Sequence, residues 1–184
     1  MSDGMRAFIG GDNGNNDLRA TNDPDGTILF ARNGNDILRG GRGNDILDGG
    51  GGDDQMFGGA GADQFRFFGS RIDGPSDTDF IRDLTFGDGD TLVLGDFGPG
   101  TFSDAEGVNA FGPAGSNDGS AAIISSFQGI VNAAASSTNV TAFRQGQGNN
   151  NLVFQITDAD GQVQNIVITG GYSQFIAAGG SDGL

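Results

Sequence analysis

A large apolar side chain recurs at every ninth position between Ala31 and Arg66. In this stretch the chain reads as four blocks of nine residues, ARNGNDILR, GGRGNDILD, GGGGDDQMF and GGAGADQFR. The first six places of a block are rich in Gly, Asn and Asp, which suit tight turns. The last three places favour a short extended strand whose middle side chain points inward. These middle, eighth-place residues are Leu38, Leu47, Met56 and Phe65.

Turn and strand repeated without interruption predict a parallel coil in which the eighth-place side chains stack as a thin core. If each block forms half a coil, the first and third blocks stack on one edge, and the second and fourth on the other. The sixth place is always aspartate, so Asp36 is expected near Asp54, and Asp45 near Asp63. Adjacent carboxylates repel each other unless a cation lies between them. Calcium suits such a gap because it takes about 6–8 oxygen ligands in flexible geometry.

The blocks resemble the calcium-binding nonapeptide of RTX (repeats-in-toxin) proteins, G-G-x-G-x-D-x-U-x. The resemblance implies a β-roll that binds Ca²⁺ in its turns through aspartate side chains and backbone carbonyl groups. The side-chain ligands expected in the repeats are Asp36, Asp45, Asp53, Asp54 and Asp63. The residues expected to offer carbonyl oxygens are Asn33, Gly40, Arg42, Gly43, Gly49, Gly50, Gly51, Gly52, Gly58, Gly59, Ala60 and Gly61.

Two other interpretations of the glycine-rich stretch are weaker. A flexible linker would share its composition, but has no reason to keep aspartate and an apolar residue in fixed register four times. A phosphate-binding loop of the P-loop type needs a lysine, and the chain contains none.

The segment after the repeats, TDFIRDLTFGDGDTLVLGDF (residues 78–97), resembles the D-x-I-x-D-F…G-x-D-x-L-x-L segment of serralysin-type proteases and related exported proteins. Leu84 stands where that pattern has phenylalanine. Alternation at Phe80 and at Leu92 and Leu94 predicts two strands joined by an acidic turn. A further calcium site and a plain turn both remain open here. The candidate ligands are Asp79, Asp83, Asp88 and Asp90.

Three regions are expected along the chain. Residues 1–30 are degenerate repeats that cap the coil, with an irregular calcium turn as the alternative, because the ends of solenoids are atypical. Residues 31–66 form the β-roll, and residues 67–184 form a β-rich C-terminal capping and secretion region with one helix. The expected fold class is therefore mainly β, a parallel β-roll followed by this cap.

Within the C-terminal region, helical spacing predicts a helix over residues 120–135, with Ser120 or Asp118 as its N-cap. Residues 95–119 are expected to form a long loop. Two apolar runs flank the sequence Asp158-Ala-Asp-Gly161 and predict a hairpin, in which a plain turn is favoured over a cation site. The last stretch resembles the C-terminal targeting tail of type I secretion substrates, with a short strand and a frayed end as the alternative.

The amino-acid composition excludes several classes of binding partner and metal ligand. The formal charge is −15, and Glu106 is the single glutamate, so the acidity comes almost entirely from aspartate. Nine arginines without a lysine predict no basic patch, which argues against nucleic acid and anionic membranes as partners. The absence of Cys and His removes disulfides, thiolate ligands and the commonest zinc ligand. No run is long enough for a transmembrane segment, and residues 1–8 lack the features of a cleavable signal.

The RTX resemblance implies a secreted bacterial protein, exported by a type I apparatus through an uncleaved C-terminal signal. We therefore expect a non-catalytic calcium-binding module, with Ca²⁺ as its cofactor, that folds on Ca²⁺ binding after export. A calcium-dependent cell-surface or polysaccharide-binding module is the alternative, as in the repeat modules of alginate epimerases. A third interpretation is the C-terminal part of a larger secreted enzyme.

Overall fold

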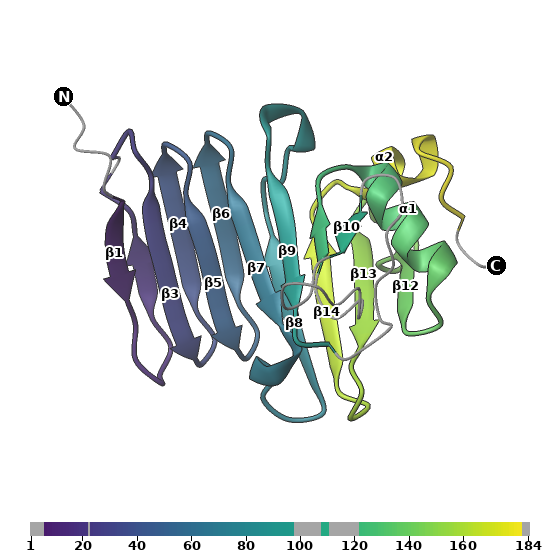
Figure 1. Ribbon diagram of the computed structural model, residues 1–184, viewed down its shortest axis with the longest axis horizontal. Helices are drawn as coiled ribbons and strands as arrows, with labels where there is room; N and C mark the ends of the chain where they lie inside the picture. Colours follow the sequence, from purple (N-terminus) through teal and green to yellow (C-terminus); the bar gives the residue numbers. More distant parts are fainter. Residues whose placement is uncertain (1–5, 22, 98–107, 111–121, 182–184) are drawn as a thin grey trace.

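The computed structural model describes residues 6–21, 23–97, 108–110 and 122–181. Its strands form two seven-stranded sheets, in the orders β1-β3-β5-β7-β9-β11-β10 and β12-β13-β14-β8-β6-β4-β2. We call them the first and the second sheet. From β1 to β9 the chain alternates between the two sheets, so it winds as a flattened parallel coil (Figure 1). The helices lie at the opposite end of the molecule from β1.

The coil consists of short strands in parallel register. The first sheet contributes β1 (Ala7–Gly10), β3 (Thr27–Asn33), β5 (Ile46–Gly51), β7 (Gln64–Phe68) and β9 (Thr91–Gly95). The second sheet contributes β2 (Asp17–Arg19), β4 (Ile37–Arg42), β6 (Gln55–Ala60) and β8 (Ser76–Ile81).

The core of the coil is a double stack of apolar side chains. In the first sheet Leu29, Leu47, Phe65 and Leu92 are register partners in turn. In the second sheet the corresponding series is Leu18, Leu38, Met56 and Ile81. All four eighth-place residues are fully buried. The predicted parallel β-roll is therefore confirmed, with one block per half-coil.

The turns depend on glycine where the chain reverses. The fourth-place glycines have positive φ angles, a conformation that side chains disfavour. A Cβ atom at Gly52 would also collide with the carbonyl oxygen of Gly34, because turns of successive coils stack closely. The angles are 120° at Gly34, 95° at Gly43, 107° at Gly52 and 130° at Gly61.

The first coil departs from the repeat but keeps its register. Ile28 is the partner of Ile46, so Thr27 occupies the place opposite Asp45. Asp17 is the partner of Ile37, so Asn16 occupies the place opposite Asp36. The strands β2 and β3 thus extend the two sheets without an aspartate in the sixth place.

The C-terminal region continues both sheets and then covers the end of the coil. In the second sheet β8 pairs in parallel with β14, and in the first sheet β9 pairs antiparallel with β11. The short 3₁₀ helices η1 (Gly69–Arg71) and η2 (Phe86–Asp88) lie in the connections around β8. The remaining elements are β10 (Val108–Ala110), β11 (Ala122–Ile124), α1 (Phe127–Ser136), β12 (Val140–Arg144), β13 (Leu152–Thr157), β14 (Val163–Ile168) and α2 (Tyr172–Ala177).

The strands predicted after the repeats are present as β8 and β9, but they lie in different sheets. In β8 the inward residue is Ile81, while Phe80 is half-buried on the outside. The predicted hairpin is formed by β13 and β14. Its turn is a plain one, because Asp158 Oδ1 accepts the backbone N–H groups of Asp160 and Gln162 at 2.9 and 2.8 Å.

The prediction for residues 120–135 was partly wrong. Residues 122–124 form β11, because they complete an antiparallel edge beside β9. The helix α1 begins only at Phe127, and its N-cap is Ser126, whose Oγ accepts the N–H of Gly129 at 3.1 Å. The expected caps, Asp118 and Ser120, lie outside the described residues, as does most of the loop expected at residues 95–119.

The chain end contains a second helix where a tail or a strand was expected. In α2 the side chains of Tyr172 and Phe175 are buried in the core, whereas Ile176 is 41% exposed. Within the described part of the chain, no helix is both long and apolar enough to cross a membrane.

Candidate functional site

Two rows of aspartates run along the roll where its turns enter the strands. In each row, Oδ1 of one aspartate accepts a hydrogen bond from the backbone N–H of the equivalent residue one coil earlier. The Asp36 row contains Asp36, Asp54 and Asp79, which accept from Asn16, Asp36 and Asp54 at 2.6, 2.8 and 2.8 Å. The Asp45 row contains Asp45, Asp63 and Asp90, which accept from Thr27, Asp45 and Asp63 at 2.6, 2.8 and 2.9 Å.

The second carboxylate oxygen divides these six aspartates into two groups. In the four aspartates of the repeats, Oδ2 is buried and has no hydrogen-bond partner. These four aspartates are at most 1% exposed, and none of them forms an ion pair with another described residue. A buried carboxylate oxygen without a donor or a cation is strongly unfavourable. The four residues are Asp36, Asp45, Asp54 and Asp63.

Burial also raises the pKa values of these carboxylates, because it disfavours their charged form. Burial raises the pKa of Asp54 to about 8 and that of Asp63 to about 6. Burial also raises the pKa values of Asp36 and Asp45. Hydrogen bonds from the backbone N–H groups oppose the effect, while neighbouring carboxylates add to it. The rows are therefore short of positive charge.

The unpaired oxygens face space that glycine leaves open. At three glycines of the repeats, a Cβ atom would collide with the Oδ2 atom of an aspartate. The Cβ of Gly40 would also collide with the carbonyl oxygen of Gly58, so carbonyl and carboxylate oxygens converge there. Each of these glycines belongs to the positions expected to offer carbonyl ligands. The pairs are Gly40 with Asp45, Gly49 with Asp54 and Gly58 with Asp63.

This donor set fits calcium. All available ligands are oxygen atoms, which calcium prefers, and the chain has no His or Cys for a softer metal. Among the residues that the structure describes, no three acidic side chains converge on one point. A bound cation would therefore complete its coordination with turn carbonyls and water.

The comparison with protein families matches the sequence of this stretch to a known repeat. Residues 30–65 match the model of the RTX calcium-binding nonapeptide repeat, in four copies. Residues 30–65 are RTX calcium-binding repeats.

One solved structure shares the fold over most of this chain, and a second is similar to it. The AlgE6R3 subunit of the mannuronan C5-epimerase from Azotobacter vinelandii is 21% identical, with a TM-score of 0.50 over 94% of this chain and 77% of that one. The AlgE6R2 subunit of the same enzyme is 20% identical, with a TM-score of 0.49 over 96% of this chain and 89% of that one. The comparison with curated proteins gives no match. The likeness to AlgE6R3 concerns the fold alone.

Three of the candidate aspartates lie outside the two rows. Asp53 is exposed, and its Oδ1 accepts the N–H of Thr78 at 2.8 Å. Asp83 accepts the N–H groups of Gly58 and Gly59 at 2.9 and 3.0 Å, and so caps the last turn of the RTX repeats. Asp88 is exposed in η2. Their positions support structural roles for Asp53 and Asp83 in the turns.

Asp79 and Asp90 continue the rows beyond the RTX repeats, but both of their carboxylate oxygens are engaged. Oδ2 of Asp79 accepts from Nε2 of Gln164 at 2.9 Å, and Oδ2 of Asp90 accepts from the N–H of Thr85 at 2.8 Å. Sequence reasoning did not identify Gln164, because a glutamine within an ordinary strand pattern gives no signal.

The fifth place of the RTX repeats holds a further contact that sequence reasoning missed. The side-chain oxygens of Asn15 and Asn35 accept the N–H groups of Asn35 and Asp53 at 2.9 and 3.2 Å. On the other edge, Asn44 Oδ1 accepts the N–H of Ala62 at 2.9 Å. The recurrence of Asn or Asp in this place was a usable signal, since such side chains commonly bond to turn backbones.

Proposed function

We propose that this chain is a non-catalytic module whose RTX repeats bind Ca²⁺ and fold when they do so. The four buried, unpartnered Oδ2 atoms of the repeat aspartates carry this proposal. Calcium would supply the positive charge and the oxygen coordination that these atoms lack. Asp36, Asp45, Asp54 and Asp63 would hold it, together with carbonyls of the adjoining turns. Because the rows exist only when the coils are stacked, the free energy of binding adds to that of folding.

The absence of catalysis is supported by the chemistry of the chain. It has no His, Cys or Lys, which removes the commonest general bases and nucleophiles. The row aspartates face turns rather than a cleft. A cavity of about 550 Å³ lies between α1, β12 and the segment after α2, and none of the described residues that line it is titratable. Its walls are small and apolar residues such as Val131, Ala134, Phe143 and Phe175.

Isothermal titration of the full chain with CaCl₂, after removal of calcium with a chelator, tests the proposal. We expect saturable binding that magnesium does not reproduce, because Mg²⁺ demands a rigid octahedral site and dehydrates reluctantly. An absence of calcium binding at millimolar concentration would contradict the proposed function. Equal binding of the two ions would contradict a calcium-specific site.

We further propose that calcium links folding to export through a type I apparatus. Extracellular calcium modules are commonly tuned to a Kd of ~10⁻⁴–10⁻³ M, so such sites stay empty in the cytosol. Repulsion within a chain of net charge −15 would then keep the repeats extended and able to pass a narrow channel. Outside the cell, filled sites would favour the folded roll and oppose backsliding.

The export signal is proposed to lie near the C-terminal end, from Phe175 onward. In a type I-competent host, a chain ending at Gly171 should not be secreted, whereas the variant Tyr172→Ala should be. The latter removes a buried contact of α2 but keeps the segment, so it controls for the folding defect of the truncated chain. Equal secretion of truncated and full chains would place the signal elsewhere.

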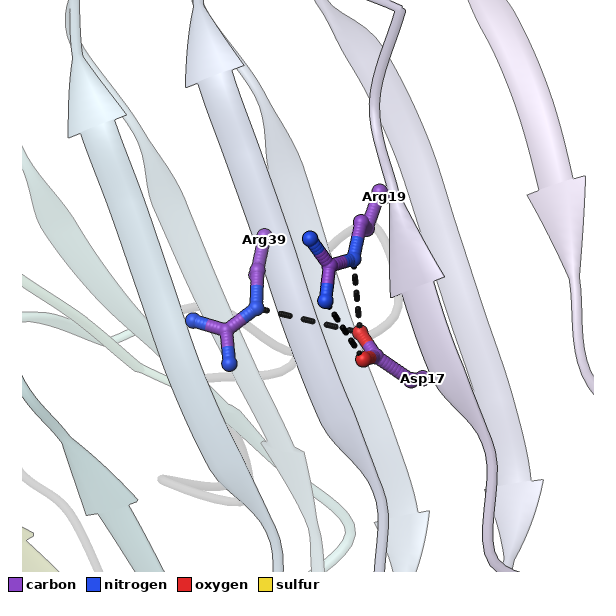
Figure 2. Close-up of polar contacts among 3 residues, drawn as sticks. All are labelled: Asp17, Arg19 and Arg39. Carbon is purple, nitrogen blue, oxygen red and sulfur yellow. Dashed lines mark hydrogen bonds and ion pairs between the residues drawn. The ribbon is translucent and has the colours of Figure 1, made fainter.

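A second candidate function, the binding of an anionic polysaccharide, is favoured by an arginine row on the outer face of the second sheet. Arg19, Arg39 and Phe57 are successive register partners, and Arg82 follows Ile81, the partner of Met56. Figure 2 shows the first part of this row, where Asp17 contacts Arg19 at 2.8 Å and Arg39 at 3.7 Å.

Aromatic rings hold two of these arginines. The guanidinium of Arg39 lies 4.5 Å from the ring centre of Phe57, and that of Arg82 lies 4.6 Å from the ring centre of Phe80. Rings of this kind orient the planar guanidinium group, whose N–H fork matches carboxylate or sulfate. Each arginine of the row comes from a different coil, so the row depends on the folded roll. A linear polymer of acidic sugars could lie along it.

Glycan binding with and without calcium tests this second function. Short mannuronate oligomers should bind in calcium, and Arg39→Gln should weaken binding several-fold. The control Arg66→Gln makes the same charge change on the other sheet, where Arg66 contacts Gln64 at 3.0 Å, and should leave binding unchanged. Equal effects of the two substitutions would exclude a site on this face.

A further inference from the structure

The boundary between unsatisfied and satisfied carboxylates coincides with the end of the RTX repeats. All four repeat aspartates leave Oδ2 without a partner. The next aspartate of each row, Asp79 or Asp90, has both oxygens hydrogen-bonded by the chain itself. The same backbone bond to Oδ1 recurs at every rung, that is, at every aspartate of the two rows. Only the surroundings of the second oxygen therefore change.

At Asp79 the second oxygen is satisfied by a side chain from a distant strand. Gln164 belongs to β14, which pairs in parallel with β8, and it is only 2% exposed. Its Nε2 donates to Asp79 Oδ2 at 2.9 Å. The amide therefore occupies the side of the carboxylate that stays unpartnered in the repeats. At Asp90 the donor is the backbone N–H of Thr85, from the turn that contains η2.

We propose that Gln164 and the Thr85 N–H terminate the Asp36 row and the Asp45 row, respectively. Asp79 and Asp90 are then hydrogen-bonded end rungs and not calcium ligands. The inference rests on the proposed calcium binding by the repeats. A neutral donor gives the buried oxygen the hydrogen bond that it needs, while its N–H group directs positive charge against any approaching cation. The end rungs thus form without metal, and present the next coil with a template already in register.

Counting bound calcium on the intact chain tests this inference, with native mass spectrometry at a calcium concentration that just fills the wild-type sites. We expect Asp54→Asn to lower the count by one and Asp79→Asn to leave it unchanged. An asparagine at position 79 keeps an oxygen for the Asp54 N–H, and its amide can donate to Oε1 of Gln164 after that side chain rotates. The substitution is therefore compatible with the fold.

The reverse substitution should create a site. Gln164→Glu places a carboxylate beside Asp79, and we expect one more bound calcium than in the wild type, with less β-structure in EGTA. The control Gln155→Glu adds the same charge to β13, on the outer face, where Gln155 contacts Asn165 at 2.8 Å. It should change neither quantity.

The outcomes separate this inference from the proposed function. A lower count for Asp79→Asn, or no additional calcium for Gln164→Glu, overturns the inference and leaves calcium binding by the repeats intact. A wild-type chain that binds no calcium overturns both.

Discussion

Oδ1 of Asp54 accepts the backbone N–H of Asp36 at 2.8 Å, while Oδ2 of the same carboxylate is buried without a partner. One oxygen thus joins two successive coils, and the other remains available for a ligand. Each repeat aspartate therefore has two roles, because the hydrogen bond that sets the register of the coils also positions the oxygen proposed to bind calcium. Removal of the carboxylate should impair folding and calcium binding together.

Removing one row carboxylate should weaken calcium binding and calcium-dependent stability in parallel. For Asp54→Ala we expect at least a tenfold loss of affinity at one site. At a calcium concentration ~100 times its Kd, each filled site adds about 2.7 kcal/mol to stability, and the variant should lose a comparable amount. Titration calorimetry and urea unfolding in calcium measure the two effects. Asp160→Ala, in the exposed hairpin turn, is the control, and an equal loss there would contradict the assignment of the rows.

Acidification should partly replace calcium. The raised pKa values of Asp54, about 8, and Asp63, about 6, belong to the metal-free fold, whereas in the unfolded chain both groups titrate near 3.8. Between these values the folded state binds more protons, so its stability is greatest below the unfolded pKa and is lost as the pH rises through 6 and 8.

In EGTA, the β-structure measured by circular dichroism should therefore increase when the pH falls from 8 to 5. The gain on adding calcium should shrink over the same range, because protons and calcium compete for the same oxygens. β-Structure in EGTA that decreases on acidification would contradict this account of the rows.

A single methyl group should block a site. In Gly49→Ala the new Cβ would collide with Oδ2 of Asp54, so we expect lower calcium affinity and a loss on the order of 2 kcal/mol in calcium. Gly87→Ala is a matched control, because a Cβ at Gly87 meets nothing within 4 Å and its φ is not positive. Thermal unfolding in calcium compares the two. A Gly49→Ala variant as stable as Gly87→Ala would show that the space beside Asp54 is not used.

An ion pair outside the turns should stabilise the roll without changing its affinity for calcium. Arg71 in η1 contacts Asp48, which is 7% exposed, and its guanidinium lies 4.9 and 4.4 Å from the ring centres of Phe30 and Phe68. It thereby joins β3, β5 and β7 on the outer face of the first sheet. Arg71→Gln leaves a buried carboxylate unpaired and should cost on the order of 2 kcal/mol.

The affinity for calcium, measured by titration, should stay within twofold of the wild type in Arg71→Gln. The double variant Arg71→Gln, Asp48→Asn should recover part of the lost stability. A large fall in calcium affinity would instead show that this pair is coupled to the rows.

The fold of the repeats follows from the sequence because the apolar and the glycine positions recur with the same nine-residue period. Leu38, Leu47, Met56 and Phe65 fix which face is inward, and the glycine of the fourth place fixes where the chain turns. One aspartate in each block then places Asp36 against Asp54 and Asp45 against Asp63. Local chemistry repeated in register was sufficient to predict these neighbours.

The cap was less predictable because it depends on pairing between distant segments. Ile123 fits a helical pattern, yet its strand β11 is formed by pairing with β9. Tyr172 and Phe175 lie in a segment of mostly small residues, and only their packing against the core makes the helix α2 favourable. The bond between Gln164 and Asp79 joins residues 85 positions apart, and no local pattern announces it.

The central claim is that calcium drives the folding of the RTX repeats, and far-ultraviolet circular dichroism of the full chain at pH 7.5 tests it most directly. The spectrum is recorded in EGTA and again in millimolar calcium. We predict a spectrum in EGTA with only the partial β-structure of the C-terminal cap, and a large reversible gain of β-structure in calcium. A spectrum already rich in β-structure in EGTA and unchanged by calcium would contradict the account.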